Sequence, residues 1–338
     1  MKKALLLILS VAIIAAAWFG WKFFGPATAF ESKNYYLHIK TGSTYQDVKN
    51  TLEKDQVISS PAFFEIVANK TDYPQKVKAG MYNIKKGMNL INIVRMLKNG
   101  QQEPVNLVIT KLRTREDLAA LAGRKFECDS AAFMAYISNA DSLKQFNLDS
   151  NTVMTNVFPN TYTYFWNTTP SKIFAKLRSN YETFWTPERI SQASEHGLNP
   201  QTAYTLASIV EEETGKKEDK GKIASVYLNR IAKGMRLSAD PTVKFALRQF
   251  GLKRIYEKHL AVESPYNTYK ITGLPPGPIC TPSPQTIDAV ITSPKTNYLY
   301  FVAKANLDGY SNFAETYEEH LKYAREYQQA LNKIMEQK

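Results

Sequence analysis

An apolar run at the N-terminus constrains this 338-residue chain more than any other feature of its sequence. Residues Ala4–Trp21 are apolar except for Ser10 and Gly20, and the run is about as long as the shortest helix that crosses a bilayer. Two lysines precede the run, and tryptophan and phenylalanine side chains follow at its far end, as at a membrane interface. The positive flank predicts a cytoplasmic N-terminus, so we expect the remaining ~310 residues to fold outside the cytoplasm.

A cleaved signal peptide is the competing interpretation of this run. Ala15–Ala17 has the small residues of a signal-peptidase site. However, the apolar run continues past these alanines without a polar region before the cut. No cysteine lies near the run, which excludes a lipoprotein anchor. The pattern favours an uncleaved single-pass anchor over residues 1–25.

The net charge of +12 points to acidic partners. Nucleic acid is the usual partner of a basic protein, but a domain outside the cytoplasm does not meet it. Anionic lipid head groups and acidic cell-wall polymer are the partners available there. The alternative, that the charge serves solubility alone, stays open.

The sequence predicts no metal site and no cofactor. The chain has two cysteines, Cys128 and Cys280, and whether they pair stays open. Two cysteines are too few for a zinc site by themselves, and the four histidines show no metal-ligand spacing.

The chain beyond the anchor divides into a small α/β module over residues 34–110 and a larger, helix-rich α+β domain over residues 111–338. Residues 26–33 between anchor and module are expected to be a short linker. Strands and helices alternate in the module, with strands expected at Tyr35–Lys40, Gly80–Ile84 and Pro104–Thr110 and helices at Thr44–Lys54, from Ser60, and at Asn89–Lys98. In the larger domain we expect mostly helices, with a buried strand at Tyr298–Ala303.

A predicted helix over residues 201–214 ends in three consecutive glutamates and a threonine. At 3.6 residues per turn, Glu213 shares a face with Leu206 and Ile209, whereas Glu211 and Glu212 turn away toward solvent. A carboxyl group beside apolar side chains loses hydration, so its pKa rises and it can hold a proton for general-acid catalysis. The alternative is a solvated helix end, which three adjacent acids usually form.

Four segments carry a resemblance to a known family. They run from Ser208 to Thr214, from Ala224 to Val243, from Tyr266 to Ile279, and from Tyr298 to His320. They include the strings Asp-Pro-Thr, Tyr-Asn-Thr-Tyr and Gly-Leu-Pro-Pro-Gly-Pro-Ile. In order and spacing they resemble the endolytic murein transglycosylases of the YceG-like family, and the likeness extends over the whole chain. The Thr-Gly-Ser-Thr turn between the first strand and helix of the module resembles the opening of LysM-type glycan-binding modules; an ordinary spacer is the alternative.

The resemblance implies a membrane-anchored enzyme of the bacterial inner membrane, with its catalytic domain on the extracytoplasmic side. The family's catalytic acid falls on Glu213, which agrees with the argument from helical phase. The implied reaction cleaves the β-1,4 bond between N-acetylmuramic acid and N-acetylglucosamine and leaves 1,6-anhydro ends. Peptidoglycan strands, nascent ones in particular, are the implied substrate, with termination of glycan elongation as the implied role and peptidoglycan synthases as the implied partners.

Six further residues are candidates for substrate contacts: Asn229, Asp240, Thr242, Tyr266, Asn267 and Tyr269. The amides are suited to N-acetyl groups and the tyrosines to sugar rings, although each is equally suited to a structural role. Asp240 is also the candidate second acid of a lysozyme-like hydrolase, because such enzymes pair two carboxylates; its structural alternative is a turn in which it binds backbone N–H groups. A non-catalytic wall-binding scaffold is the remaining alternative.

Overall fold

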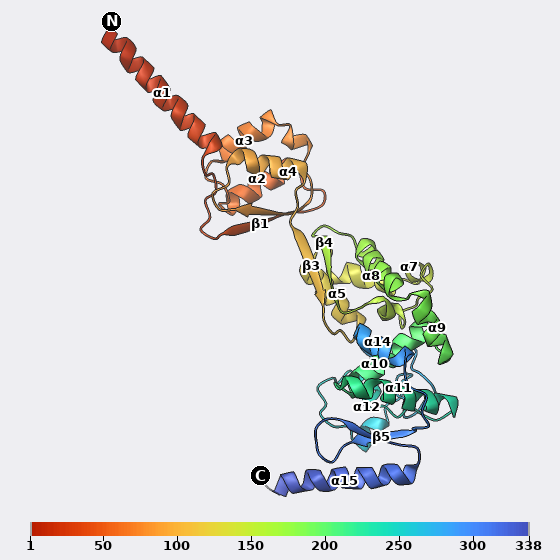
Figure 1. Cartoon of the computed structure of the whole chain (residues 1–338). Coiled ribbons are helices and arrows are strands. Elements are labelled where there is room, and N and C mark those ends of the chain that lie inside the picture. Colours follow the sequence, from red (N-terminus) through yellow and green to blue (C-terminus); the bar gives the residue numbers. More distant parts are fainter. Residues whose placement is uncertain (1, 337–338) are drawn as a thin grey trace. The chain divides into compact units, whose positions relative to one another are not determined.

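The structure is a computed structural model that describes residues 2–336. The chain forms two compact units (Figure 1). The first comprises residues 1–107, 123–129 and 163–169, and the second comprises residues 108–122, 130–162 and 170–338. In the described residues the strands form two-stranded sheets that pair β1 with β2, β3 with β4, and β5 with β6. The architecture is a helix-rich α+β fold, as expected.

The first unit begins with helix α1 (Lys2–Phe24), which is long and apolar enough to cross a membrane. The elements that follow are β1 (Asn34–Ile39), α2 (Tyr45–Lys54), α3 (Pro61–Lys70), a 3-10 turn (Tyr73–Gln75), β2 (Gly80–Lys85), α4 (Leu90–Asn99) and the start of β3 (Pro104–Ile109). Strands β1 and β2 are antiparallel, with Leu37 opposite Tyr82. The helices lie against one side of this pair in Figure 1, around a core that includes Leu52, Phe64 and Leu97.

Local sequence explains the boundaries of these helices. Thr44 caps α2 by a capping box with Asp47, in which each side chain accepts a hydrogen bond from the other residue's backbone N–H. Helix α3 has Pro61 at its first position, where a missing N–H costs nothing. Helix α4 ends at Gly100, whose φ of 71° lies in the left-handed region that glycine adopts without strain.

The expected linker after the anchor is instead part of the packed first unit. Ala27 is buried, its N–H donates to the carbonyl of Met88, and its own carbonyl accepts from Ser59 N–H. Thr28 forms an isolated antiparallel bridge with Ile58. The prediction of a linker was therefore wrong at these residues. The backbone partners of Ala27 are Ser59 and Met88, which are distant in the sequence, so no local pattern predicts these hydrogen bonds.

The second unit contains most of the helices. Its elements are α5 (Arg115–Lys125), α6 (Ser130–Ser138), α7 (Ala140–Lys144), a 3-10 turn (Val153–Asn156), β4 (Asn160–Phe165), α8 (Pro170–Phe184), α9 (Pro187–Glu195), α10 (Pro200–Glu213), α11 (Lys217–Ala232), α12 (Asp240–Ala246), α13 (Glu257–Leu260), α14 (Pro284–Ile291), β5 (Tyr300–Ala303), β6 (Ser311–Ala314) and α15 (Tyr317–Glu336), with α5 and β4 shared with the first unit. Helices α10, α11 and α14 pack around one core with Tyr204, Tyr227 and Ile287 inside.

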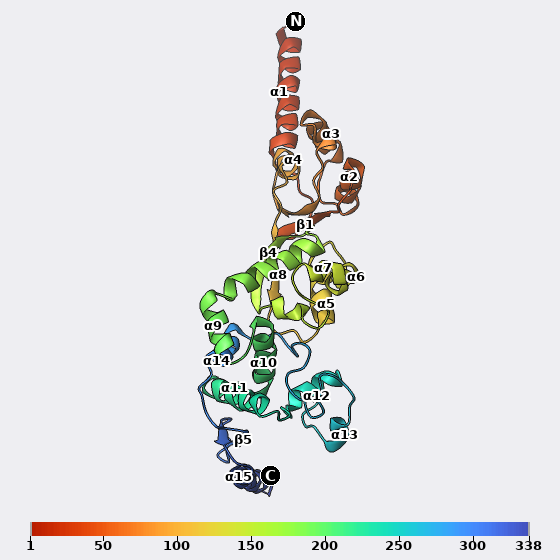
Figure 2. The same cartoon turned by 90° about the vertical axis from the view of Figure 1, so that its right-hand side faces the viewer.

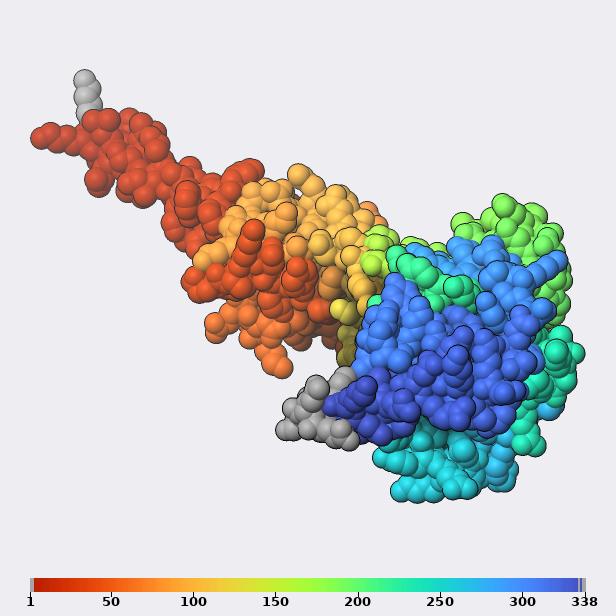
Figure 3. Space-filling view, turned by 60° about the horizontal axis from the view of Figure 1, so that its bottom comes forward, coloured from red at the N-terminus to blue at the C-terminus, as the bar shows by residue number. Residues whose placement is uncertain are grey.

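The C-terminal elements differ from expectation in the extent and burial of β5 and in the presence of β6. Strand β5 begins at Tyr300, and all four of its residues are half-buried rather than buried. Its partner β6 was not expected from the sequence. In Figure 3 this C-terminal segment, in blue, forms part of the surface of the second unit beside the cyan segment near residue 250. A strand near the surface is covered on one side only, which explains the partial exposure.

Candidate functional site

The three glutamates end helix α10, which begins with a cap at Asn199 and Pro200 at its first position. The helix is buried on all sides, since every residue from Ala203 to Val210 is buried. Helical phase therefore does not separate an inner from an outer face here. All three glutamates are partly buried, so the expectation that Glu211 and Glu212 are exposed was wrong.

Glu211 lies in a network of hydrogen bonds beside α11 and α14. Lys220 Nζ lies 2.8 Å from Glu211 Oε2, and the Ser283 hydroxyl donates to the same oxygen at 3.1 Å. Thr286 also donates to this oxygen. Burial alone would raise the pKa of Glu211, but the hydrogen bonds from Lys220 and Thr286 outweigh it and lower that pKa overall. Glu211 is thus held as a carboxylate.

Glu212 is held as a carboxylate by different partners. Lys111 Nζ lies 2.7 Å from Glu212 Oε1, and Arg113 Nη2 lies 3.1 Å from Oε2. Burial again acts to raise the pKa of Glu212, and the hydrogen bond and charge of Lys111, together with Arg113, lower it overall. Both neighbours of Glu213 are therefore neutralised by lysine or arginine.

Glu213 differs from its neighbours because no described lysine or arginine lies within ion-pair distance of it. Its carboxyl accepts a hydrogen bond from the Tyr227 hydroxyl of α11 at 2.6 Å from Oε1. Burial raises the pKa of Glu213 to about 7; the Tyr227 hydrogen bond opposes this rise and the negative charge of Asp240 adds to it. The predicted rise in pKa is confirmed and burial is its largest cause, although α10 is buried on all sides over Ala203–Val210 rather than along one face.

Asp240 and Tyr269 lie near enough to this carboxyl to interact with it electrostatically. The Tyr269 hydroxyl donates to Asp240 Oδ1 at 2.6 Å, and none of the described backbone N–H groups donates to that carboxylate. Burial raises the pKa of Tyr269 first, and the hydrogen bond to Asp240 raises it further. Since Asp240 and Glu213 also influence each other electrostatically, the structure brings these three predicted residues together.

Asn229 and its neighbour Arg230 hold the chain that leads into β5. The Asn229 amide donates to the carbonyls of Thr296 and Tyr298 at 2.8 and 2.9 Å. Arg230 donates to the carbonyls of Leu299 and Leu237 at 2.7 and 2.6 Å. Both amide hydrogens of Asn229 are thus engaged by backbone, which gives this residue a positioning role at the end of α11.

Asn267 and Thr242 lie in the interior, fully buried. The Asn267 amide donates to the carbonyls of Leu260 and Val262 at 2.9 and 2.8 Å. The Thr242 hydroxyl donates to the Ala239 carbonyl and lies 2.8 Å from that of Thr268. These residues fix the loop that carries Tyr269 and the helix start that carries Asp240.

Tyr266 has electrostatic neighbours other than Glu213, namely Asp149, Arg115 and Arg248. Its ring lies 4.6 Å from that of Phe245, and it lines a small cavity of about 80 Å³ with Arg115 and Arg248. A Cβ on Gly277, in the proline-rich loop, would lie 2.1 Å from the Asn151 carbonyl oxygen and 3.1 Å from the Tyr266 hydroxyl. The loop therefore packs closely here, and only glycine fits.

Sequence reasoning missed Tyr227, Arg230 and Lys244 as electrostatic neighbours of Glu213. Tyr227 lies within the segment that carried the family resemblance, but nothing local marks it. The available signal was that Tyr227 lies on the amphipathic helix that follows the glutamates. One face of that helix must pack on α10.

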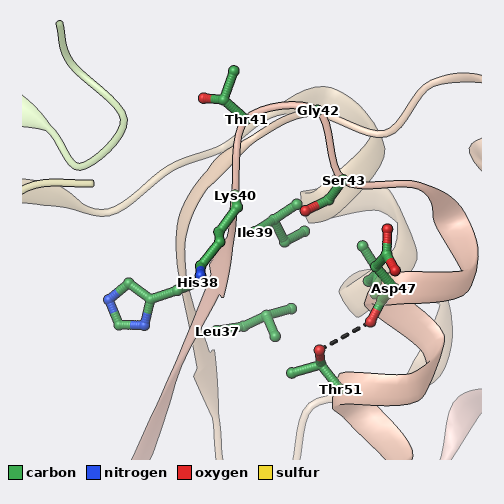
Figure 4. A pocket seen from close by; sticks show the side chains of 10 residues that line it. Leu37, His38, Ile39, Lys40, Thr41, Gly42, Ser43, Asp47 and Thr51 are labelled. Atoms are coloured by element: carbon green, nitrogen blue, oxygen red, sulfur yellow. Dashed lines mark hydrogen bonds between the residues drawn. The ribbon is translucent and has the colours of Figure 1, made fainter. Parts of the chain in front are cut away.

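A much larger cavity than the one beside Tyr266 belongs to the first unit. It is an open depression of about 460 Å³ between β1 and α2, lined by residues that include His38, Lys40, Thr41 and Asp47. Figure 4 shows Leu37 and Ile39 pointing toward α2 at its base. Glu127 fixes its rim, because its carboxylate accepts from Thr41 N–H at 2.6 Å and from the Thr41 hydroxyl at 2.7 Å. Cavity size and acid chemistry thus select different units. We place the candidate active site at Glu213, because hydrogen bonds from Thr44 lower the pKa of Asp47, which lines the depression, whereas the pKa of Glu213 is raised.

A comparison with protein-family models matches residues 37–326 to the YceG-like family. The chain belongs to the YceG-like family. A relative from Bacillus subtilis named endolytic murein transglycosylase is 31% identical over 86% of this chain and 84% of its own length. A protein of the same name from Streptococcus pneumoniae is 27% identical over 93% of this chain, which spans 63% of that longer protein.

A solved structure agrees with this assignment. The crystal structure of a yceG-like protein from Listeria monocytogenes matches with a TM-score of 0.58 and 28% sequence identity. The match covers 86% of this chain and 99% of the Listeria chain. The YceG-like match includes both the module and the helices that carry Glu213.

Proposed function

We propose that this chain is a peptidoglycan lytic transglycosylase that cleaves the β-1,4 bond between N-acetylmuramic acid and N-acetylglucosamine within glycan strands. Membership of the YceG-like family and the names of the relatives support this enzyme class. No cofactor enters the proposed reaction.

The observation that carries the proposal is the contrast between Glu213 and its two neighbours. Glu211 and Glu212 are held ionised by cations, whereas the pKa of Glu213 is raised to about 7. A group with this pKa is about half protonated at neutral pH, so it can give a proton and take one back within a single turnover. A single carboxyl that performs both transfers is what a reaction without a nucleophilic water requires.

The Glu213 carboxylic acid donates its proton to the glycosidic oxygen, and the bond from that oxygen to the anomeric carbon of N-acetylmuramic acid breaks. The resulting carboxylate removes the proton from the 6-hydroxyl of the same sugar, whose oxygen bonds to the anomeric carbon. The products are a 4-hydroxyl on N-acetylglucosamine and a 1,6-anhydro ring, and Glu213 recovers its proton. Tyr227 holds the carboxylate through its hydroxyl between the two transfers.

A hydrolase that uses Glu213 and Asp240 is the second candidate. It is favoured by one observation, which is that Asp240 lies close enough to raise the pKa of Glu213. The hydrogen bond that Asp240 accepts from Tyr269 is compatible with a nucleophile or base as well as with a sugar-binding role.

The first unit supplies the proposed location. We assign α1 as a single-pass anchor in the bacterial cytoplasmic membrane, with both globular parts on the extracytoplasmic side, because lysines precede its apolar run. We further propose that the strand–helix–helix–strand module with the open depression is a LysM-like glycan-binding module. An anchored enzyme reaches nascent strands first, so we propose that it terminates their elongation beside peptidoglycan synthases.

End-group analysis of digested peptidoglycan tests the proposal. We expect the full-length chain in detergent to release fragments with 1,6-anhydro ends, and we expect the Glu213→Gln variant to lose activity by at least ~10²-fold. Reducing ends in place of anhydro ends would favour the hydrolase. Cleavage retained by Glu213→Gln would exclude Glu213 as the acid, and no cleavage by the wild type would favour a wall-binding scaffold.

A further inference from the structure

Helix α3 of the first unit touches the membrane-spanning part of α1. The ring of Phe63 in α3 lies 5.8 Å from that of Trp18, 5.9 Å from Phe19 and 5.3 Å from Phe23. Lys22 Nζ donates to the Ser60 hydroxyl just before α3 at 3.3 Å. Figures 1 and 2 both show the start of α3 beside the last turns of α1.

The position of this contact along α1 corresponds to the edge of the bilayer that α1 would cross. The apolar run Ala4–Trp21 is ~27 Å long at 1.5 Å per residue, close to the ~30 Å thickness of a hydrocarbon core. Trp18 lies nearly one helical turn, ~4.5 Å, inside the end of this run. A side chain that contacts both Trp18 and Phe19 must therefore lie at the boundary between hydrocarbon and head groups.

The segment that joins α1 to the module keeps α3 at this level. The Gly25 N–H continues the helix by donating to the Trp21 carbonyl at 2.8 Å, and Ala27 is hydrogen-bonded on both sides to the module. The Asn89 amide donates to the Phe24 carbonyl at 3.4 Å. These bonds leave no unattached linker between α1 and the module. The module therefore cannot move away from the bilayer surface without breaking them.

The outer face of α3 carries apolar side chains followed by a lysine, which suits a segment at the membrane interface. Phe64, Val67 and Ala68 face the core of the module, whereas Ala62 and Ile66 are exposed, Ile66 by 45%. Ile66 lies three residues after Phe63, so both are on the same side of the helix. Lys70, one turn further on and exposed, is suited to the head-group layer.

We propose that Ala62, Phe63 and Ile66 form a membrane-contact face that inserts into the interfacial layer of the bilayer in which α1 is embedded. This face seats the module on the membrane surface and fixes its orientation there. The proposal rests on the proposed anchoring by α1 and is independent of the reaction at Glu213. We expect this face to bind a lipid surface, because it continues the apolar surface of α1.

Fluorescence of site-labelled full-length chain in liposomes tests this face. In a Cys128→Ser background, an environment-sensitive probe is attached at Ile66→Cys or Ala62→Cys; Cys280 is buried and does not compete. Tyr36→Cys, an exposed position on strand β1, is the matched control, and Ile8→Cys within α1 reports insertion of the anchor. Lipids that carry a quencher at shallow or deep positions give the depth of each probe.

We expect the probes at positions 62 and 66 to emit at shorter wavelength than the probe at 36 and to be quenched most by shallow quenchers. A quenched probe at position 8 with water-like emission at 62 and 66 overturns the membrane-contact face while it leaves the anchor intact. An unquenched probe at position 8 overturns both. Emission at 62 and 66 that is shifted but insensitive to lipid quenchers assigns the face to a protein partner and also overturns the proposal.

Discussion

The Tyr227 hydroxyl lies 2.6 Å from Oε1 of Glu213 and donates a hydrogen bond to it from the neighbouring helix α11. Tyr227 is itself buried, so it has no water to replace this bond. A hydroxyl in this position stabilises the carboxylate form more than the acid form, since a charged acceptor binds a donor more strongly. Tyr227 therefore limits how far burial raises the pKa of Glu213.

Replacing Tyr227 with phenylalanine tests this positioning role. We expect the pKa of Glu213 to rise, because the substitution removes the hydrogen bond that lowers it, and the alkaline limb of the pH–activity profile to move to higher pH. The rate should fall by about tenfold, as the carboxylate formed after proton donation loses a charge-assisted hydrogen bond.

The matched control for Tyr227→Phe is Tyr204→Phe. Tyr204 is also fully buried in the same core and donates its hydroxyl to the Val157 carbonyl. Both variants lose one buried hydrogen bond at a cost of about 1 kcal/mol in stability. Only Tyr227→Phe should shift the pH profile, and an equal shift in the control would contradict the assignment.

Glu213 should lower the free energy of unfolding of the second unit as the pH rises, whereas a typical acid raises that free energy. The folded pKa is raised from 4.5 to about 7, so the folded state binds more protons than the unfolded state between these values. Stability from this group is complete below pH 4.5 and is lost as the pH rises through about 7, by about 3 kcal/mol in all. We expect Glu213→Gln to unfold at higher temperature than the wild type at pH 8 and at a similar temperature at pH 4.5. A variant less stable than the wild type at pH 8 would contradict the burial of this carboxyl.

Glu211 should show the ordinary acid dependence. Its folded pKa is lowered, so it contributes stability above pH 4.5 that is lost as the pH falls through the folded value. Glu211→Gln leaves the charge of Lys220, whose side chain is 11% exposed, without its carboxylate. We expect a loss of about 3 kcal/mol in the free energy of unfolding at pH 7. The control is Glu326→Gln on the exposed side of α15, which should change that free energy little; equal effects in both variants would show that the Glu211–Lys220 pair is not structural.

The sequence identified Glu213 but not what distinguishes it from its neighbours. Helix α10 and its start were predictable, because Asn199, Pro200 and the apolar run are local signals. The cations that neutralise the other two glutamates come from Lys111, Arg113 and Lys220, and the first two lie about a hundred residues earlier. A periodic pattern in the sequence cannot predict pairs of residues that lie so far apart along the chain. The same holds for Asn267 and Thr242, whose polar side chains satisfy buried backbone and hydroxyl groups that appear only once the chain has folded.

Asp240→Asn separates the two candidate reactions. The substitution removes a negative charge that raises the pKa of Glu213, so that pKa should fall and the alkaline limb of activity should move to lower pH, opposite to the effect of Tyr227→Phe. Asparagine retains an oxygen that can accept from the Tyr269 hydroxyl, so the local structure should persist. In a transglycosylase the 6-hydroxyl of the sugar is the nucleophile, so we expect reduced but measurable cleavage with anhydro ends unchanged. In a hydrolase that depends on two carboxylates the same change removes the nucleophile or base and abolishes turnover. Retained cleavage with anhydro ends, or complete loss of cleavage, therefore decides whether Asp240 tunes the acid or takes part in the chemistry.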